Sequence, residues 1–302
     1  MTILVSGGTG FVGRFIVENL LAAGRDVSVL GRVGPSAGFF SREVGFVEGA
    51  LDPDRDQRAA FAGVEAFVHA AFDHLPGRYR GGEGDDPDGF RRRNIDGTAA
   101  LFAQAKAAGV GRVVFLSSRA VYGAQPPGMA LLEETAPHPD TLYGEVKRAA
   151  EAALRSLGDD GFLGVSLRVT GVYGPPGPGQ EHKWAALFRD WLAGRAITPR
   201  VATEVHGRDV AEAVRLVLAT PQTALPGDLL NVSDIVVDRR DLLAMVKAAT
   251  GAAHALPPRA DVAALNVADT ARLRGFGWRP GGWDLLENTV RALVAPPAAR
   301  GL

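Results

Sequence analysis

Tyr143 and Lys147 carry side chains that can move protons, and they stand four residues apart in YGEVKRAAEAALRSLG (143–158), a segment with helical spacing. Residues four apart share one face of a helix, so the phenol and the ammonium would be neighbours. An isolated tyrosine has a pKa of about 10, and a nearby positive charge lowers it towards the working range of an acid or base. The spacing therefore indicates general acid–base chemistry at Tyr143, unless the two residues form only an exposed surface pair.

Two more polar residues fall where such chemistry would need them. Ser118 ends RVVFLSS (112–118), an apolar run that predicts a buried strand. Ligands of parallel α/β sheets bind at the carboxyl ends of the strands, which places this serine at the ligand-binding edge. Asn94 lies in a second expected helix, FRRRNIDGTAALFAQAKAAG (90–109). Taken singly, they would be a turn residue and a helix cap; together with the helical pair they form a candidate catalytic set.

A glycine-rich turn supplies a second kind of chemistry. GGTGFVG (7–13) follows the apolar run ILVSG and opens an amphipathic segment that ends at Gly24. Gly7 permits a tight turn, Gly10 lets a pyrophosphate approach the backbone, and Gly13 lets helix and strand pack closely. The helix N-terminus adds N–H donors and the positive end of its dipole. This context favours dinucleotide binding over a strand-to-helix turn without a ligand.

Arg32 bears on which dinucleotide binds. The second strand, DVSVLG, ends at Gly31-Arg32, where NAD-binding folds place an acid that holds the ribose hydroxyls. No carboxylate stands there, and a guanidinium matches the geometry of a phosphate. Unless Arg32 is only a solvated surface residue, it predicts NADP as the cofactor, with NAD as the alternative.

Several of these features together resemble the short-chain dehydrogenase/reductase superfamily: the Gly-x-x-Gly-x-x-Gly spacing, HAA at 69–71, Ser118 and Tyr143-x-x-x-Lys147. More narrowly, the sequence is similar to its extended branch, the NAD(P)-dependent epimerase/dehydratase family. The resemblance covers nearly the whole chain. Further segments in the order of that family are NIDGTAALF (94–102), LSSRAVYG (116–123), LRVTGVYGP (167–175), VHGRDVAEAV (205–214) and LLNVSD (229–234).

The resemblance assigns roles to the candidate residues. It implies that the Ser118 hydroxyl holds the substrate oxygen, that Tyr143 exchanges a proton with it, and that Lys147 also binds the nicotinamide ribose. Ser118 is chosen over its neighbour because it stands five residues before Gly123. Asn94 would support the lysine through water. The resemblance also implies cofactor contacts from both members of the helical pair and from Thr9, Phe11, Val12, Leu51, Ala70, Ala71, Ser117, Val169 and Thr170.

Departures from the family pattern limit the reactions that we expect this protein to catalyse. Arg119-Ala120 stand where dehydratases carry an acidic pair, which disfavours sugar dehydration. Gly171 and Ala202 replace an asparagine and an arginine that hold the diphosphate in nucleotide-sugar epimerases, although Arg200 lies near. The expected function is an NAD(P)-dependent oxidoreductase that interconverts a carbonyl and a secondary alcohol on a small substrate. The alternatives are a sugar or nucleotide-sugar epimerase and a non-catalytic NADP-sensing regulatory protein.

The elements that must position these residues alternate between strands and helices. This predicts an α/β fold, a Rossmann-like doubly wound parallel sheet with a small C-terminal substrate-binding lobe. Residues 1–174 would form the dinucleotide-binding domain, to which 206–234 returns. Residues 175–302 would form the lobe, mainly from 175–205 and 235–302.

Two polar, Gly/Pro-rich segments, 73–89 and 174–184, are expected to flank the substrate entrance and to be mobile without ligand. The helices expected over 90–109 and 143–158 would also pair with their copies in a homodimer, by analogy with the family.

The composition excludes several classes of function. The 302 residues include 33 basic and 34 acidic side chains, so no basic surplus points to nucleic acid. There is no cysteine for disulfide or thiolate chemistry, and the six histidines show no metal-ligand spacing. No apolar run reaches the roughly 18 residues of a membrane span. The sequence predicts a soluble cytoplasmic protein with a small-molecule substrate and no metal, nucleic-acid or membrane partner.

Overall fold

The chain folds around a parallel sheet of seven strands, as the alternating pattern predicts. The computed structural model describes residues 2–75, 81–225 and 227–295. Within them the strand order is β3-β2-β1-β4-β5-β6-β9, and every neighbouring pair is parallel. The strands are β1 (Thr2–Ser6), β2 (Asp26–Gly31), β3 (Gly45–Glu48), β4 (Val64–His69), β5 (Arg112–Ser118), β6 (Leu163–Val169) and β9 (Leu229–Val232). This confirms the Rossmann-like fold, with the order reversing between β1 and β4.

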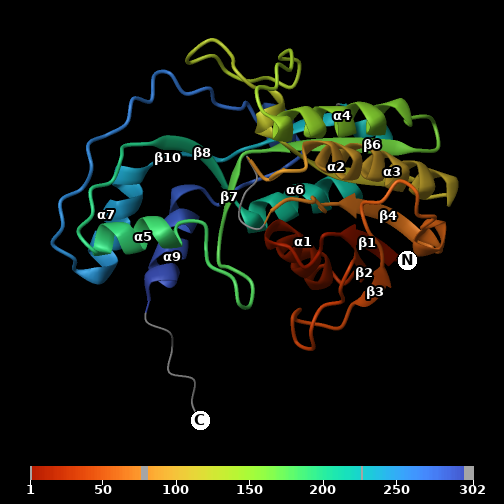
Figure 1. The fold of residues 1–302 in the computed structure, drawn as a ribbon, viewed down its shortest axis with the longest axis horizontal. Helices are drawn as coiled ribbons and strands as arrows, with labels where there is room; N and C mark the ends of the chain where they lie inside the picture. The colour runs from red at the N-terminus through yellow and green to blue at the C-terminus, as the bar shows by residue number, and fades with distance from the viewer. Residues whose placement is uncertain (1, 76–80, 226, 296–302) are drawn as a thin grey trace.

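Helices cover both faces of this sheet (Figure 1). On one face lie α1 (Phe11–Ala22) and α6 (Gly207–Ala219), and on the other lie α3 (Thr98–Ala107) and α4 (Leu142–Ser156). Side chains of β1 alternate between the two cores: Ile3 and Val5 pack with α1 and α6, whereas Leu4 packs with α3 and α4. Because both faces are buried, the strands read in the sequence as unbroken apolar runs.

The helical segment expected over 90–109 differs in detail from the structure. It begins earlier, because Pro87 suits the first turn and the Asp86 carboxylate accepts a hydrogen bond from Gly89 N at 2.9 Å. It is also divided into α2 (Pro87–Arg91), a π-helical turn η2 (Arg92–Gly97) and α3. Part of the segment 73–89, expected to be a loop, is therefore helical, and residues 76–80 lie outside the described residues.

A second, smaller sheet continues from the end of β6. Its strands β7 (Gly171–Tyr173), β8 (Val201–His206) and β10 (Ile235–Asp238) are ordered β10-β8-β7. Strands β7 and β10 share an apolar core with α5 (Ala185–Leu192), α7 (Arg239–Thr250) and α9 (Gly282–Val294), at the left of Figure 1. The remaining short helices are η1 (Arg58–Phe61), η3 (Arg119–Val121), η4 (Gln222–Ala224) and α8 (Ala271–Gly275).

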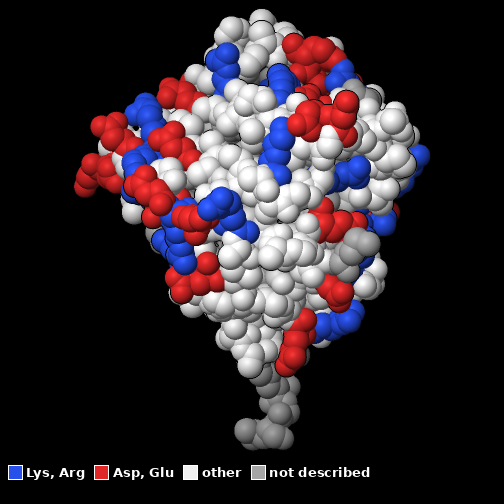
Figure 2. Space-filling view, turned by 90° about the vertical axis from the view of Figure 1, so that its right-hand side faces the viewer, with Lys and Arg blue, Asp and Glu red and all other residues white. Residues whose placement is uncertain are grey.

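Charged side chains of both signs are interspersed on the face shown in Figure 2, and neither sign gathers there into one continuous patch. This distribution agrees with the nearly balanced charge of −1. Among the described residues, none of the helices has the length and apolar character needed to cross a bilayer.

Candidate active site

The predicted cofactor and catalytic segments meet at one edge of the seven-stranded sheet. The strand ends lie level, because Leu30 of β2 and His69 of β4 both pair with Ser6 of β1. Further along, Ser118 of β5 pairs with Val169 of β6. The glycine turn, the segment after β4 and the candidate serine therefore all leave the sheet at its carboxyl edge, where ligands of such sheets bind.

The geometry of the glycine turn is suited to binding a phosphate group. Gly7 has a φ of 68°, and a Cβ added to it would lie 2.6 Å from Ala71 N. A Cβ on Gly13 would collide with Gly7 O, so helix α1 packs directly on the turn. Gly10 is the N-cap of α1, is exposed, and provides no side chain to satisfy the first N–H groups of the helix. These N–H donors and the bare backbone fit a pyrophosphate.

Most of the other predicted cofactor-binding residues lie around the same edge. They are Thr9, Phe11 and Val12 at the glycine turn, Leu51 after β3, Ala70 and Ala71 after β4, and Val169 and Thr170 at the end of β6. Ser117 differs, because it is buried and its hydroxyl donates a hydrogen bond to Glu151 Oε1 of α4 at 2.5 Å.

Lys147 lies on the same face of α4 as Tyr143. Its side chain is 5% exposed, its Nζ donates to Leu116 O at 2.8 Å, and Nζ lies 6.0 Å from the centre of the Tyr143 ring. Nζ also lies 4.6 Å from the centre of the Phe72 ring. Burial lowers the pKa of Lys147 to about 7, and the negative charge of Glu151 opposes this shift. The ammonium is thus held next to the phenol and gains or loses its proton close to neutral pH.

Close packing of two backbones brings Ser118 towards Tyr143. Gly144, which follows the tyrosine, approaches Ala120 so closely that an added Cβ would lie 2.5 Å from Ala120 O. Ala120 N donates to Ser118 Oγ at 3.1 Å, so the serine hydroxyl caps η3 and keeps its own hydrogen for another acceptor. The end of β5 and the first turn of α4 are therefore in direct contact.

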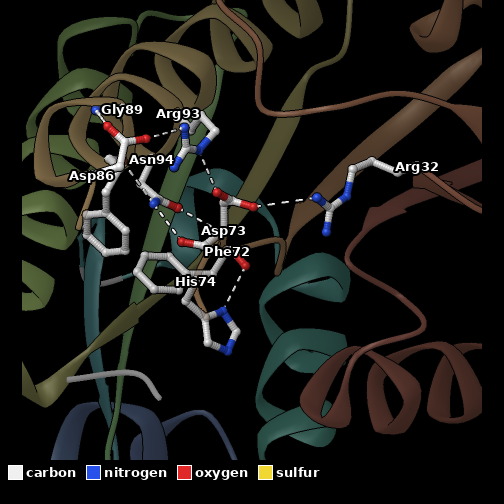
Figure 3. Close-up of polar contacts among 9 residues, drawn as sticks. Arg32, Phe72, Asp73, His74, Asp86, Gly89, Arg93 and Asn94 are labelled. Carbon is white, nitrogen blue, oxygen red and sulfur yellow. Dashed lines mark hydrogen bonds and ion pairs between the residues drawn. The ribbon is translucent and has the colours of Figure 1, made fainter. Parts of the chain in front are cut away.

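Asn94 is buried, with 3% of its surface exposed, and it holds the segment after β4 (Figure 3). Its Oδ1 accepts from Asp73 N at 2.9 Å, and its Nδ2 donates to Asp73 O at 2.8 Å and Phe90 O at 3.0 Å. The bond to Phe90 ties this side chain to the backbone of the preceding turn, at the π-helical turn itself. The water-mediated support of Lys147 that the resemblance implies stays a prediction.

Phe72 belongs to the site although sequence reasoning missed it. Its ring meets the Tyr143 ring edge-to-face, with the centres 5.1 Å apart, and the Phe90 ring at 5.5 Å. Phe72 therefore packs against both members of the candidate pair, Tyr143 and Lys147. The only signal in the sequence is an aromatic residue directly after the HAA segment.

Arg32 extends from the end of β2 towards the segment after β4 (Figure 3). Its Nη1 lies 3.6 Å from Asp73 Oδ1, and 79% of its side chain is exposed. The guanidinium thus stands on the cofactor side of the sheet, as its predicted contact with a 2′-phosphate requires.

A buried ion pair ties α4, the helix that carries Tyr143 and Lys147, to β6. Glu151, one turn after the candidate lysine, accepts two hydrogen bonds from Arg168 of β6, at 3.0 and 2.7 Å. Both side chains are buried, and the carboxylate also accepts from Ser117. A bidentate pair of this kind fixes the position of the helix relative to β5 and β6. No local pattern in the sequence indicates this pairing, because it joins residues of two separate elements.

Gly171, at the start of the second sheet, faces an ion pair. A Cβ added there would lie 2.5 Å from Lys183 Nζ and 2.6 Å from Glu204 Oε2. These two charged groups pair with each other, and the Glu204 side chain is buried. An asparagine at this position would require the Lys183 and Glu204 side chains to shift. Within the described parts of the chain, no group of three or more His, Asp or Glu side chains is placed to hold a metal ion.

Comparison with known proteins agrees with this architecture. The family described as NAD dependent epimerase/dehydratase matches residues 3–233. A 3-beta-hydroxysteroid dehydrogenase of Mycolicibacterium neoaurum is 32% identical over 64% of this chain and 52% of its own length. A UDP-glucose 4-epimerase of Streptomyces lividans is 33% identical over 51% of this chain and 49% of its own length. The matched region thus spans about half of each of these relatives.

Among solved structures, the UDP-glucose 4-epimerase of Thermus thermophilus in complex with NAD is 30% identical and superposes with a TM-score of 0.75. The alignment covers 96% of this chain and 97% of that one. The family match covers well over half of the chain. The chain belongs to the NAD dependent epimerase/dehydratase family.

Proposed function

We propose that the protein is an NADP-dependent oxidoreductase that interconverts a carbonyl and a secondary alcohol on a small substrate. The observation that carries this proposal is the buried Lys147 ammonium beside Tyr143, on the helix whose first turn contacts the segment after Ser118. This arrangement is suited to moving one proton to or from a substrate oxygen at the sheet edge.

In the direction of reduction, the Ser118 hydroxyl donates a hydrogen bond to the carbonyl oxygen and polarises it. Tyr143 then gives its proton to that oxygen as negative charge develops there. Lys147 stabilises the phenolate that remains, because an ammonium in a buried site acts strongly on a neighbouring anion. The bound nicotinamide supplies the hydride. Oxidation of the alcohol runs the same proton transfer in reverse.

The backbone of Gly7–Gly13 would hold the pyrophosphate, and Arg32 would contact the 2′-phosphate. Support for NADP comes from the guanidinium at the end of β2 and from the lack of a carboxylate at Gly31 or Arg32. The family and the Thermus structure support a nicotinamide dinucleotide in general.

The second sheet with α5, α7 and α9 would form the substrate-binding lobe, since it begins where β6 leaves the catalytic edge. Gly171 and Ala202 stand where the family resemblance implies an asparagine and an arginine that hold a nucleotide diphosphate, and their small size supports a substrate without that group. The second candidate function is nucleotide-sugar epimerisation, which the names of the Streptomyces and Thermus relatives favour.

A panel of aldehydes, ketones and sugars, read at the nicotinamide absorbance with NADPH and NADH, tests the proposal. We expect turnover with at least one carbonyl and no conversion of UDP-glucose to its 4-epimer. Epimerisation of UDP-glucose would establish the second candidate. Tight dinucleotide binding without oxidation of the cofactor by any carbonyl would instead support a regulatory protein.

A further inference from the structure

The Asp73 carboxylate lies between two arginines that come from different parts of the sheet edge (Figure 3). Arg93 Nε of η2 lies 2.5 Å from Asp73 Oδ2, and Arg32 Nη1 lies 3.6 Å from Asp73 Oδ1. Arg93 has a second acidic partner, Asp86, at 3.1 Å. Arg93 thus pairs with both Asp73 and Asp86. Of these two acids, only Asp73 also pairs with Arg32.

The Arg32–Asp73 ion pair crosses the carboxyl end of β1. Strands β2 and β4 flank β1, and adjacent strands are spaced by about 4.8 Å, so their ends stand roughly 10 Å apart. Arg32 directly follows β2, and Asp73 comes four residues after the end of β4. The pair therefore spans the glycine turn at the point where the strand order reverses, which is the ligand crevice of such sheets.

The two partners differ in how firmly they are held. Asn94 binds both the N–H and the carbonyl of Asp73, and Arg93 binds the carboxylate, so Asp73 has a fixed position and a largely compensated charge. Arg32 is mostly exposed, and its contact with the carboxylate is long. Arg32 is thus the partner that can move to another anion.

We propose that Asp73 sets the discrimination between NADP and NAD, because its carboxylate competes with the 2′-phosphate for the Arg32 guanidinium. This inference rests on the proposed function, in which the adenosine end of the dinucleotide lies at Arg32. Binding of NADP requires Arg32 to exchange one anion for another, whereas binding of NAD requires no such exchange. Exposed ion pairs are weak, so Asp73 should lower the affinity for NADP by only about 2- to 5-fold.

Isothermal titration of the full chain with NADP, NAD and adenosine 2′,5′-bisphosphate tests this competition. Asp73→Asn keeps the backbone that Asn94 holds and should tighten both 2′-phosphorylated ligands by about 2- to 5-fold, leaving NAD unchanged. Asp86→Asn is the matched control, since it also removes an acid from Arg93 and does not contact Arg32; it should change none of the three affinities. The increase in affinity caused by Asp73→Asn should become smaller at high ionic strength.

The Arg32→Ala variant distinguishes failure of the proposed competition from failure of the cofactor assignment. Arg32→Ala should weaken the binding of NADP. Adding Asp73→Asn to this variant should not increase the affinity for NADP. If Arg32→Ala weakens NADP but Asp73→Asn has no effect, or acts equally on NAD, the competition is wrong and the cofactor assignment stands. If Arg32→Ala leaves NADP binding intact, both the phosphate assignment and the competition fail. If neither dinucleotide binds, the proposed function itself is overturned.

Discussion

At the scale of single residues, the environment of Lys147 is the most unusual feature of the site. A buried cation is costly, and here it is compensated by one carbonyl, the faces of aromatic rings and a glutamate one turn away. Such a group contributes little to stability and is retained where its charge serves chemistry.

The energetic cost of burying the Lys147 ammonium predicts how the stability of the protein depends on pH. The pKa of Lys147 falls from 10.5 to about 7 on folding, so between these values the unfolded chain binds one more proton than the folded one. The contribution of Lys147 to the free energy of unfolding therefore rises as the pH increases from about 7 to 10.5. Lys147→Met should be more stable than the wild type at pH 6, by on the order of 1–4 kcal/mol, and the difference should fade towards pH 10.

Denaturant unfolding at several pH values would measure this difference, with Lys247→Met on α7 as the control. The same Lys147→Met protein should lose both dinucleotide affinity and turnover. A Lys147→Met variant that is less stable than the wild type at pH 6 would show that the buried ammonium is not a cost.

At the scale of elements, the sequence predicted the segments whose signals are local. The strands β2 and β5 have the expected residues, because each is an apolar run with a turn on either side. No apolar run marks strand β3, because it has four residues, three of them exposed. The π-helical turn was missed because it has no local signal in the sequence; Asn94 within it binds the backbone of Asp73, a residue distant in the chain.

The contact between α4 and η3 yields a test of helix placement. Gly144→Ala should push α4 away from Ala120 O, because the added Cβ has no room, and turnover should fall by about tenfold or more as the proton donor moves from its position. Gly275→Ala in α8 is the matched control, since its Cβ would meet nothing within 4 Å. Steady-state kinetics and thermal unfolding would compare the two. Wild-type turnover in Gly144→Ala would mean that this close approach does not position the site.

At the scale of the whole molecule, the two sheets are joined in the chain by the single residue Thr170. Strand β6 of the large sheet ends at Val169, and β7 of the small sheet begins at Gly171. The proposed cofactor half and substrate half are therefore joined next to Val169, which pairs with the candidate serine, Ser118. The sequence pointed to this division through its Pro/Gly-rich break at 174–184, but the pairing of β7 with β8 depends on tertiary contacts that have no local signal.

Ligand binding at the carboxyl edge of the large sheet should reduce the mobility of the segment 174–184. Arg14 of α1 donates hydrogen bonds to Pro175 O and Pro176 O, so ordering the first turn of α1 by a pyrophosphate should also restrain this segment. Hydrogen exchange with and without NADPH would show added protection there and in the described part of 73–89, with α9 as the unaffected reference. Equal exchange in both states would refute the coupling.

In the proposed reaction the phenol of Tyr143 transfers the proton. Tyr143→Phe keeps the ring and its packing on Phe72 and removes only the oxygen. Single-turnover rates with an active carbonyl, measured beside dinucleotide dissociation constants, test the claim most directly. We predict a loss in rate on the order of 100-fold or more with dinucleotide affinity nearly unchanged, since the pyrophosphate is held by Gly7–Gly13. A Tyr143→Phe enzyme that reduces its substrate at close to the wild-type rate would contradict the account.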